Sequence, residues 1–138
     1  MVCWAHPDKS YETLEFMVQT TCTILKKLGI TYRVVLLRAT DMPLTATKAY
    51  DIECPIGNEW REVATISNCE QLQTERTKTK VRIGETKRFV HCLNGSALAV
   101  GRTMAALMEK YYDNQSNSIK IQRNHFKTFV ICAETAGE

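Results

Sequence analysis

One arginine stands where its charge suggests a function. Between Cys92 and Met108 the only charged residue is Arg102, and the residues around it predict the first turns of an α-helix. The N-terminal end of a helix carries partial positive charge, which disfavours a cation there. An anionic ligand bound by both Arg102 and the helix terminus would explain the position. A carboxylate from another strand, paired with Arg102, would explain it equally well.

Carboxylates form the second candidate group. Two strand-like segments, residues 48–54 and 60–66, are joined by a turn at residues 55–58 and should form an antiparallel hairpin. Because side chains alternate between the faces of a strand, Asp51 and Glu53 share one face of the first segment. In the second segment the alternation predicts two sets: Glu62, Ala64 and Ile66 on one face, and Arg61, Val63 and Thr65 on the other.

Such carboxylates could act in two ways. Converging carboxylates can hold Mg²⁺, which prefers oxygen ligands and substrate phosphates. They could instead form salt bridges with Arg61, Arg76 or Arg102, and the pattern leaves both interpretations open.

Two helices should support these groups. The first is predicted at Ser10–Leu28, with Ser10 or Asp8 as its cap and Gly29 just beyond its end. The second is predicted at Ala97–Tyr112, after a strand at 89–93 and a turn at 94–96 in which Ser96 would be the N-cap. Its expected apolar face consists of Val100, Met104, Leu107, Met108 and Tyr111.

The remaining strands are less clearly placed. Residues 1–5 and 31–37 are predicted strands, and the second, rich in β-branched residues, is expected at the centre of the sheet. Ser118–Ile121 could form another short strand. Between Arg76 and Ile83 basic and non-basic residues alternate, which predicts a strand with one basic face and a turn at Gly84–Glu85. That face could contact RNA phosphates or simply protect an edge strand.

Composition limits the class of protein. The chain has 138 residues, 44% of them hydrophobic and 24% charged, which fits one domain with a substantial core. No apolar run approaches the roughly 20 residues of a membrane span, so no membrane partner is expected. Six scattered cysteines without a CxxC pair argue against zinc and predict reduced, mostly buried thiols. A net charge of +3 is too small by itself to indicate nucleic-acid binding.

Residues 91–103 carry a specific resemblance. Their pattern, H-x-L-N-G-S-x-L-A-V-G-R-T, resembles the third signature motif of seryl-tRNA synthetases, which are class II aminoacyl-tRNA synthetases. Two further stretches resemble the region before that motif: K-x-Y-D-x-E at 48–53 and R-E-x-x-x-x-S-N-C at 61–69. The segment at 69–77 is similar to the family's F-Q-x-x-R, with Gln73 and Arg76 retained.

The resemblance implies an activity and a set of roles. The family uses ATP to form seryl-adenylate and then transfers serine to tRNA(Ser). Arg102 would be the catalytic residue that neutralises phosphate charge. ATP would be bound by Glu62, Val63, Ala64, Thr65 and Arg102, the Mg²⁺ by Glu62 and Thr65, and serine by Ser96 and Asn94.

The chain departs from the family pattern at several positions. Ala64 replaces a small hydroxyl residue, Cys92 replaces a common threonine, and Glu75 stands where arginine is frequent. After residue 121 the match is lost. The domain division expected is therefore a synthetase-like core at 1–121, with the third motif at 91–103, and a divergent tail at 122–138.

The resemblance covers only the C-terminal half of the catalytic domain. The expected fold is therefore α+β: a class II synthetase-like antiparallel sheet flanked by helices, present as a partial domain. The family's second motif, its dimer-forming first motif and its tRNA-gripping arm have no counterpart here. Unpaired sheet edges and exposed apolar surface should follow.

Three functions are compatible with these features. The leading one is that of a cytoplasmic serine–tRNA ligase, or a mitochondrial one, in which this chain carries part of the active site and is inactive alone. Serine, tRNA(Ser) and a second subunit would then be partners of the full-length enzyme. The second is a catalytically inactive paralogue or truncated product that acts by binding. The third is a ligase that loads an amino acid onto a carrier protein.

Overall fold

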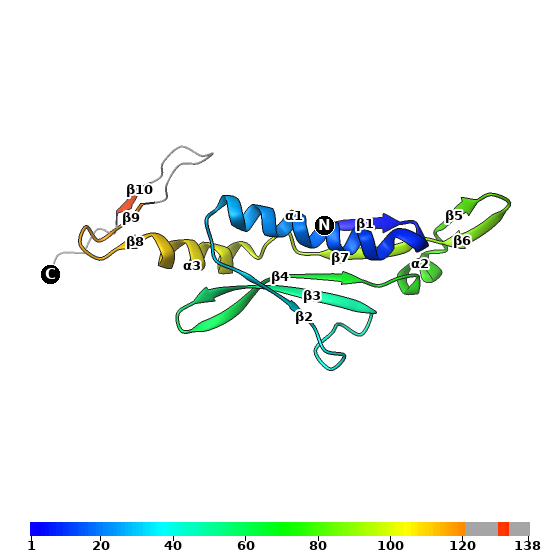
Figure 1. The fold of residues 1–138 in the computed structure, drawn as a ribbon, viewed down its shortest axis with the longest axis horizontal. Helices are drawn as coiled ribbons and strands as arrows, with labels where there is room; N and C mark the ends of the chain where they lie inside the picture. The colour runs from blue at the N-terminus through cyan, green and yellow to red at the C-terminus, as the bar shows by residue number, and fades with distance from the viewer. Residues whose placement is uncertain (121–129, 133–138) are drawn as a thin grey trace.

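A computed structural model describes residues 1–120 and 130–132. Its elements are β1 (Val2–Ala5), the 3₁₀ helix η1 (Pro7–Lys9), α1 (Ser10–Lys27), β2 (Arg33–Leu36), β3 (Lys48–Ile56), β4 (Glu59–Asn68), α2 (Leu72–Thr77), β5 (Lys80–Ile83), β6 (Thr86–Phe89), β7 (His91–Gly95), α3 (Val100–Tyr111), β8 (Tyr112–Asp113), β9 (Ser118–Lys120) and β10 (Val130–Cys132). Five strands form the main sheet in the order β1-β7-β4-β3-β2, and all neighbours are antiparallel. The predicted α+β fold with flanking helices is confirmed (Figure 1).

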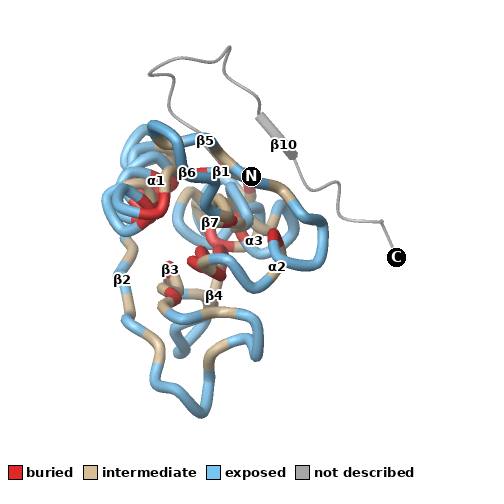
Figure 2. The backbone as a smooth tube through the Cα atoms, turned by 90° about the vertical axis from the view of Figure 1, so that its right-hand side faces the viewer, coloured by how far each residue is buried: buried red, intermediate tan, exposed pale blue. Residues whose placement is uncertain are grey.

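Helix α1 covers one face of this sheet. Its side chains at helical spacing, among them Leu14, Val18 and Leu25, are buried against β4 and β7. Figure 2 shows the buried residues gathered on α1 and on the strands beside it. The helix ends as predicted, with Gly29 in the left-handed conformation at φ +69°. The predicted cap was wrong, because the N-cap residue is Lys9 and no side chain caps this helix.

The strand at Arg33–Leu36 lies at the edge of the sheet rather than at its centre. In the part of the chain that the structure describes, it pairs only with β3, and Val34 and Leu36 are 42% and 58% exposed. The prediction of a central strand was therefore wrong. β-Branched residues indicate a pleated strand, but they do not indicate how many neighbours it has.

Helix α3 begins later than predicted. Strand β7 continues through Gly95, and the helix starts at Val100 with Ala99 as an N-cap that makes no side-chain bond. Ser96 is therefore not the cap. The reason is tertiary, since the backbone N–H groups of Ser96 and Ala99 are bonded to carbonyls of β4.

The apolar face predicted for this helix is only partly buried. Ala106 is in the core and Leu107 packs against it, but Val100, Met104 and Met108 are 74%, 51% and 41% exposed. The helical spacing predicted for these five residues is confirmed, but the apolar face that they form is exposed at those three positions. The expectation of exposed apolar surface is confirmed by the same residues.

The basic segment after α2 is not one long strand. Arg76 and Thr77 belong to α2, and Lys78 adopts the left-handed conformation at φ +55°, so the strand begins at Lys80. It pairs only with β6, in a two-stranded ribbon separate from the main sheet, through the predicted turn at Gly84. In Figure 1 this ribbon projects at one end of the molecule, whereas α3 lies toward the other.

The C-terminal part is described incompletely. A strand predicted at 118–121 is found at 118–120, where it pairs with β8 and β10. The boundary expected at residue 121, and the tail expected at 122–138 apart from residues 130–132, lie outside the described residues. Of the helices in the described ranges, none is long and apolar enough to cross a membrane.

Candidate functional site

A bulge in β4 decides which side chains meet on the sheet. Opposite β3, Ala64 pairs with Ile52 and Glu62 pairs with Glu53, so that Val63 is an extra residue without a partner in the ladder. Residues that face each other across a ladder lie on the same side of the sheet. The bulge therefore moves Glu62 onto the side that carries Thr65, which strict alternation had excluded.

The α1 side and the opposite side of the sheet differ in character. Tyr50 and Lys48 bond to Glu15 of α1, which identifies the α1 side. The opposite side, here called the open face, carries polar and charged residues of four strands. By their register these are Arg33, Asp51, Glu53, Glu62, Thr65 and Asn94.

The segment that leads into α3 runs along β4. The Ser96 backbone N–H donates to the Thr65 carbonyl at 3.2 Å, and the Ala99 N–H donates to the Val63 carbonyl at 2.6 Å. One turn later Arg102 Nη1 donates to the Glu62 carbonyl at 2.7 Å. Three successive contacts thus bind the third-motif segment to the bulged strand, and they place Ser96 beside Thr65 and Arg102 beside Glu62.

Arg102 also forms an ion pair with a carboxylate of another strand. Its Nη1 lies 3.7 Å from Glu62 Oε1, and the two side chains are 54% and 42% exposed. This is the pairing that the sequence left open as an explanation of Arg102. An exposed pair at that distance stabilises the fold by about 1 kcal/mol or less, so the guanidinium can still bind an anion.

Asp51 is a half-buried carboxylate of the open face. Thr65 Oγ1 donates a 2.6 Å hydrogen bond to its Oδ1. Burial raises the pKa of Asp51, and repulsion by Glu62 and Glu53 raises it further, while the bond from Thr65 opposes the shift. These interactions indicate that the three carboxylates lie within electrostatic reach of one another, as the sequence predicted for a convergent group.

Salt bridges account for part of this group. Arg33 Nε bonds Glu53 Oε2 at 2.5 Å, and its guanidinium lies 4.6 Å from the Trp60 ring centroid. With the Glu62–Arg102 pair, two of the three carboxylates have a basic partner. Arg61, one of the predicted partners, instead pairs with Glu59. Within residues 1–120 and 130–132, no three His, Cys, Asp or Glu side chains are placed to hold a metal by themselves.

The remaining predicted site residues differ in how far they are exposed. Asn94 is half-buried on the open face and donates to Cys69 Sγ at 3.5 Å, while Ser96 is exposed. Val63 and Ala64 are 0% and 1% exposed. A ligand on the open face could therefore meet these two only through their main-chain atoms, and the Val63 carbonyl is already bonded to Ala99.

Gly95 permits the close approach of β7 to β4 at this point. A Cβ there would lie 2.8 Å from Ile66 Cγ1 and 2.9 Å from the Thr65 carbonyl oxygen. The absence of a side chain at residue 95 is thus a condition for the contact between Ser96 and Thr65.

The sequence did not reveal a buried polar cluster beneath β7. His91 Nδ1 lies 2.8 Å from Ser10 Oγ, Asn68 Nδ2 donates to the same oxygen at 3.2 Å, and Ser10 Oγ donates to the Pro7 carbonyl at 3.3 Å. Ser10 is fully buried. Its hydroxyl has partners on three sides and no access to a substrate, so this serine–histidine pair is structural. Ser10, Asn68 and His91 are far apart in the sequence, and no local pattern predicts that their side chains meet.

One edge of the sheet is open. Among the described residues, strand β1 pairs only with β7, and on it Val2 and Trp4 are 75% and 67% exposed. Their register with Asn94 and Cys92 places both on the open face. The expectation of an unpaired edge with exposed apolar side chains is confirmed here.

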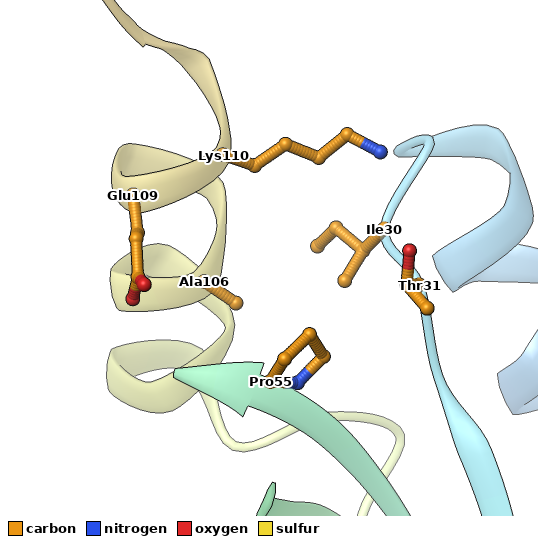
Figure 3. A pocket seen from close by; sticks show the side chains of 6 residues that line it. All are labelled: Ile30, Thr31, Pro55, Ala106, Glu109 and Lys110. Carbon is orange, nitrogen blue, oxygen red and sulfur yellow. The ribbon is translucent and has the colours of Figure 1, made fainter. Parts of the chain in front are cut away.

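A shallow pocket of about 300 Å³ lies away from the predicted site residues. It is formed where α3 meets the segment after α1 and the end of β3, and its lining residues are Ile30, Thr31, Pro55, Ala106, Glu109 and Lys110 (Figure 3). Its two charged side chains are engaged with backbone groups: Glu109 accepts from the Gly57 N–H at 2.7 Å, and Lys110 donates to the Gly29 carbonyl. Both charged side chains of the pocket are therefore occupied by contacts within the chain.

Sequence comparisons relate this chain to a known group of proteins. Residues 1–111 match the family of the tRNA synthetase class II core domain (G, H, P, S and T). The chain is similar to the serine–tRNA ligase of Polaromonas naphthalenivorans, with 48% identity over 114 residues, or 80% of this chain and 26% of that protein. It is equally similar to that of Neisseria meningitidis, with 48% identity over 124 residues, or 88% of this chain and 28% of that protein.

Solved structures give the same result. A seryl-tRNA synthetase from Pyrococcus horikoshii complexed with ATP superposes with a TM-score of 0.81 at 31% identity, over 87% of this chain and 28% of that one. A cytoplasmic serine–tRNA ligase from Naegleria fowleri in complex with AMP gives 0.75 at 32% identity, over 82% and 28%. This chain thus spans less than a third of the length of these relatives.

Proposed function

Because this chain belongs to the seryl-tRNA synthetase family of class II tRNA synthetases, we propose that it carries part of the active site of an ATP-dependent serine–tRNA ligase. The supporting observation is the strip of three contacts in which Ser96, Ala99 and Arg102 bond the carbonyls of Thr65, Val63 and Glu62. That strip brings together residues from two separate family-like segments.

The role of each side chain follows from its chemistry. Arg102 is half-exposed and only weakly paired, so its guanidinium is available to a phosphate oxygen in a bidentate mode. Positive charge at that point would stabilise charge that develops on the phosphates during adenylate formation. Val63 and Ala64 would follow the nucleotide with their backbone, because their side chains are buried.

The open face also fits the magnesium ion that would accompany ATP. Mg²⁺ is usually held by one or two carboxylates together with substrate phosphates rather than by a complete set of protein ligands. Glu62 and the hydroxyl of Thr65 share the open face after the bulge and are the proposed ligands. The ion would supply neutralisation of phosphate charge, while the chain fixes the position of its two oxygen ligands.

The serine site is proposed beside this strip. Asn94, on the open face, and Ser96, bonded through its backbone to Thr65, offer an amide and a hydroxyl that could bind the amino acid. Serine and tRNA(Ser) would be substrates of the full-length enzyme. A second copy of the full-length enzyme, forming a homodimer, is a further proposed partner. The free thiols Cys3, Cys22, Cys54, Cys69 and Cys92 suit a reducing compartment, for which we propose the cytoplasm, with the mitochondrion as the alternative.

The isolated chain should bind ATP without charging tRNA. Catalysis of this type depends on positioning and electrostatics across a whole pocket, and the chain spans 26% to 30% of its relatives. Titration calorimetry of ATP–Mg²⁺ into the purified chain tests the binding, with Arg102→Ala expected to abolish saturable heat. Arg61→Ala is the matched control, because Arg61 is an exposed arginine of the same strand as Glu62 and pairs only with Glu59 among the described residues. Absence of binding by a cooperatively folded wild-type chain would contradict the proposal.

A second function has one observation in its favour. The exposed edge of β1, with Val2 and Trp4, is a surface through which a non-catalytic relative could bind another protein. Serine-dependent exchange of pyrophosphate into ATP separates the two functions. Exchange by the chain combined with the remainder of a family enzyme supports the ligase. Failure of that mixture, with ATP binding also absent, supports the binding protein. Exchange accompanied by transfer of serine to tRNA supports the tRNA ligase, whereas exchange with the tRNA left uncharged would point to a carrier-loading ligase.

A further inference from the structure

The ribbon of β5 and β6 concentrates the positive charge of the chain. Residues 80–89 contain four Lys or Arg and one Glu, a net charge of +3, which equals the net charge of the entire chain. The remaining residues together therefore carry no net charge. The ribbon pairs with no strand of the main sheet and projects at one end of the molecule (Figure 1).

The two faces of the ribbon have different partners. Arg88 lies opposite Val81 and bonds the carboxylate of Asp8 at 3.1 and 3.3 Å, which ties this face to the segment before α1. The other face carries Lys80, Arg82 and Lys87, here called the basic face. All three of its cations are exposed.

The charges of the basic face have no acidic partner in the described part of the chain. Arg82 lies directly opposite Lys87 in the ladder, and no carboxylate pairs with either among residues 1–120 and 130–132. Lys80 lies 4.5 Å from the Phe89 ring centroid, a cation–π contact that leaves its charge uncompensated. Like charges directly opposite each other destabilise a strand pair, so this arrangement carries a cost in the free chain that a bound polyanion would remove.

The chemistry of the ribbon favours RNA over a membrane surface. Binding at a membrane interface requires apolar side chains that enter the lipid, and the apolar residues of the ribbon, Val81, Ile83 and Phe89, are half-buried rather than exposed. Cations on alternate residues of a strand are about 6.6 Å apart. A two-stranded ribbon of this width can follow a phosphate backbone without reading bases.

We propose that the basic face, Lys80, Arg82 and Lys87, is a docking surface for the phosphate backbone of RNA. The inference rests on the proposed function in one respect, namely that RNA is the polyanion on which a serine–tRNA ligase acts. It adds a contact surface at the other end of the molecule from most of α3 (Figure 1), on an element to which none of the proposed ATP and serine residues belongs.

Fluorescence anisotropy with a fluorescein-labelled RNA stem-loop tests this surface. The full chain should bind, and its affinity should fall steeply between about 50 mM and about 200 mM salt. The double variant Arg82→Gln/Lys87→Gln should bind on the order of tenfold more weakly, and the slope of log K against log[salt] should decrease in magnitude by about 1 for each lost contact. The matched control is Lys26→Gln/Lys27→Gln, which removes the same charge from the exposed end of α1.

Misfolding is separated from lost binding by two measurements. Removal of the Arg82–Lys87 repulsion should leave the melting temperature unchanged or raised, and the charge-preserving variant Arg82→Lys/Lys87→Arg should retain RNA binding. The inference would be overturned by any of three results. The control pair could lose as much RNA affinity as the ribbon variant, or the wild type could fail to bind RNA at low salt. The third result is binding to vesicles that contain phosphatidylserine more strongly than to RNA. Titration of ATP into the variant Arg82→Gln/Lys87→Gln distinguishes failure of this inference from failure of the proposed ATP site. The ATP affinity of the variant should equal that of the wild type whether or not RNA binds.

Discussion

Thr65 donates a 2.6 Å hydrogen bond from its hydroxyl to Oδ1 of Asp51, across two strands whose register is set by the bulge at Val63. The bond holds a desolvated carboxylate next to Glu53 and Glu62. It also fixes the rotamer of Thr65, one of the two proposed metal ligands. Asp51 is therefore a positioning residue for the open face, and its raised pKa predicts that its charge lowers the stability of the chain at neutral pH.

Asp51→Asn should stabilise the chain at neutral pH. Asparagine keeps the Oδ1 acceptor for Thr65 and removes the charge whose pKa is raised above its ordinary value of 3.8. A carboxyl with a raised folded-state pKa binds more protons in the folded than in the unfolded state, so stability falls as the pH rises through the window between the two values. The variant should melt a few degrees higher than the wild type at pH 7. The difference in melting temperature between variant and wild type should shrink as the pH is lowered through that window toward 3.8.

Thermal melts followed by circular dichroism across this pH range are the measurement. Asp41→Asn in the exposed loop before β3 is the control and should shift the melting temperature little at any pH. A variant Asp51→Asn less stable than the wild type at pH 7 would show that the carboxylate is stabilising, and the interpretation of its burial would be wrong.

Gly95→Ala should destabilise the fold at the strip between β7 and β4. The new Cβ would lie 2.8 Å from Ile66 Cγ1 and 2.9 Å from the Thr65 carbonyl oxygen, and backbone there must move to admit it. We expect a loss of about 1–3 kcal/mol in the free energy of unfolding, as for other overpacked sites. Urea unfolding measures it.

Gly101→Ala provides the matched control for that substitution. No heavy atom lies within 4 Å of its Cβ, and the residue belongs to α3. Gly101 lies in the first turn of the helix, where alanine should be neutral or stabilise by about 0.5 kcal/mol or less. Equal effects of the two substitutions would mean that β7 does not approach β4 as closely as described.

Ser10→Ala should destabilise the chain through the polar cluster beneath β7. It removes the oxygen that Asn68 Nδ2 and His91 Nδ1 contact, and Asn68 is completely buried. A buried donor left without a partner costs about 1–3 kcal/mol. Chemical denaturation should show this loss, whereas Thr20→Ala, which removes an exposed hydroxyl of the same helix, should change stability by about 0.5 kcal/mol or less. A neutral Ser10→Ala would refute the structural role of the cluster.

Cys54 should be the least reactive of the described thiols. It is completely buried, and burial raises its pKa to about 11, so almost no thiolate is present at neutral pH. Cys3 is only half-buried and should be alkylated first. Mass spectrometry of chains treated with iodoacetamide, native and in denaturant, gives the order. Modification of Cys54 at the rate of Cys3 in the native chain would mean that the core around β3 opens readily.

The amino-acid sequence alone determined the class of fold and the family. Helical spacing of apolar residues located α1, alternation and turn residues located the β3–β4 hairpin, and the motif at 91–103 identified a seryl-tRNA synthetase-like segment. These are local properties, since each depends on residues a few positions apart. The roles assigned to Arg102, Glu62, Thr65, Ser96 and Asn94 remain predictions.

Tertiary structure decided what local patterns could not. Strict alternation placed Glu62 and Thr65 on opposite faces, and only the pairing of β4 with β3 revealed that the bulge at Val63 brings them together. Likewise, Ser96 has the residue type of an N-cap, yet its N–H bonds a carbonyl of β4, so that α3 begins at Val100. Register and long-range hydrogen bonds depend on partners distant in the chain, and the free energy of those contacts outweighs the small preferences of single residues.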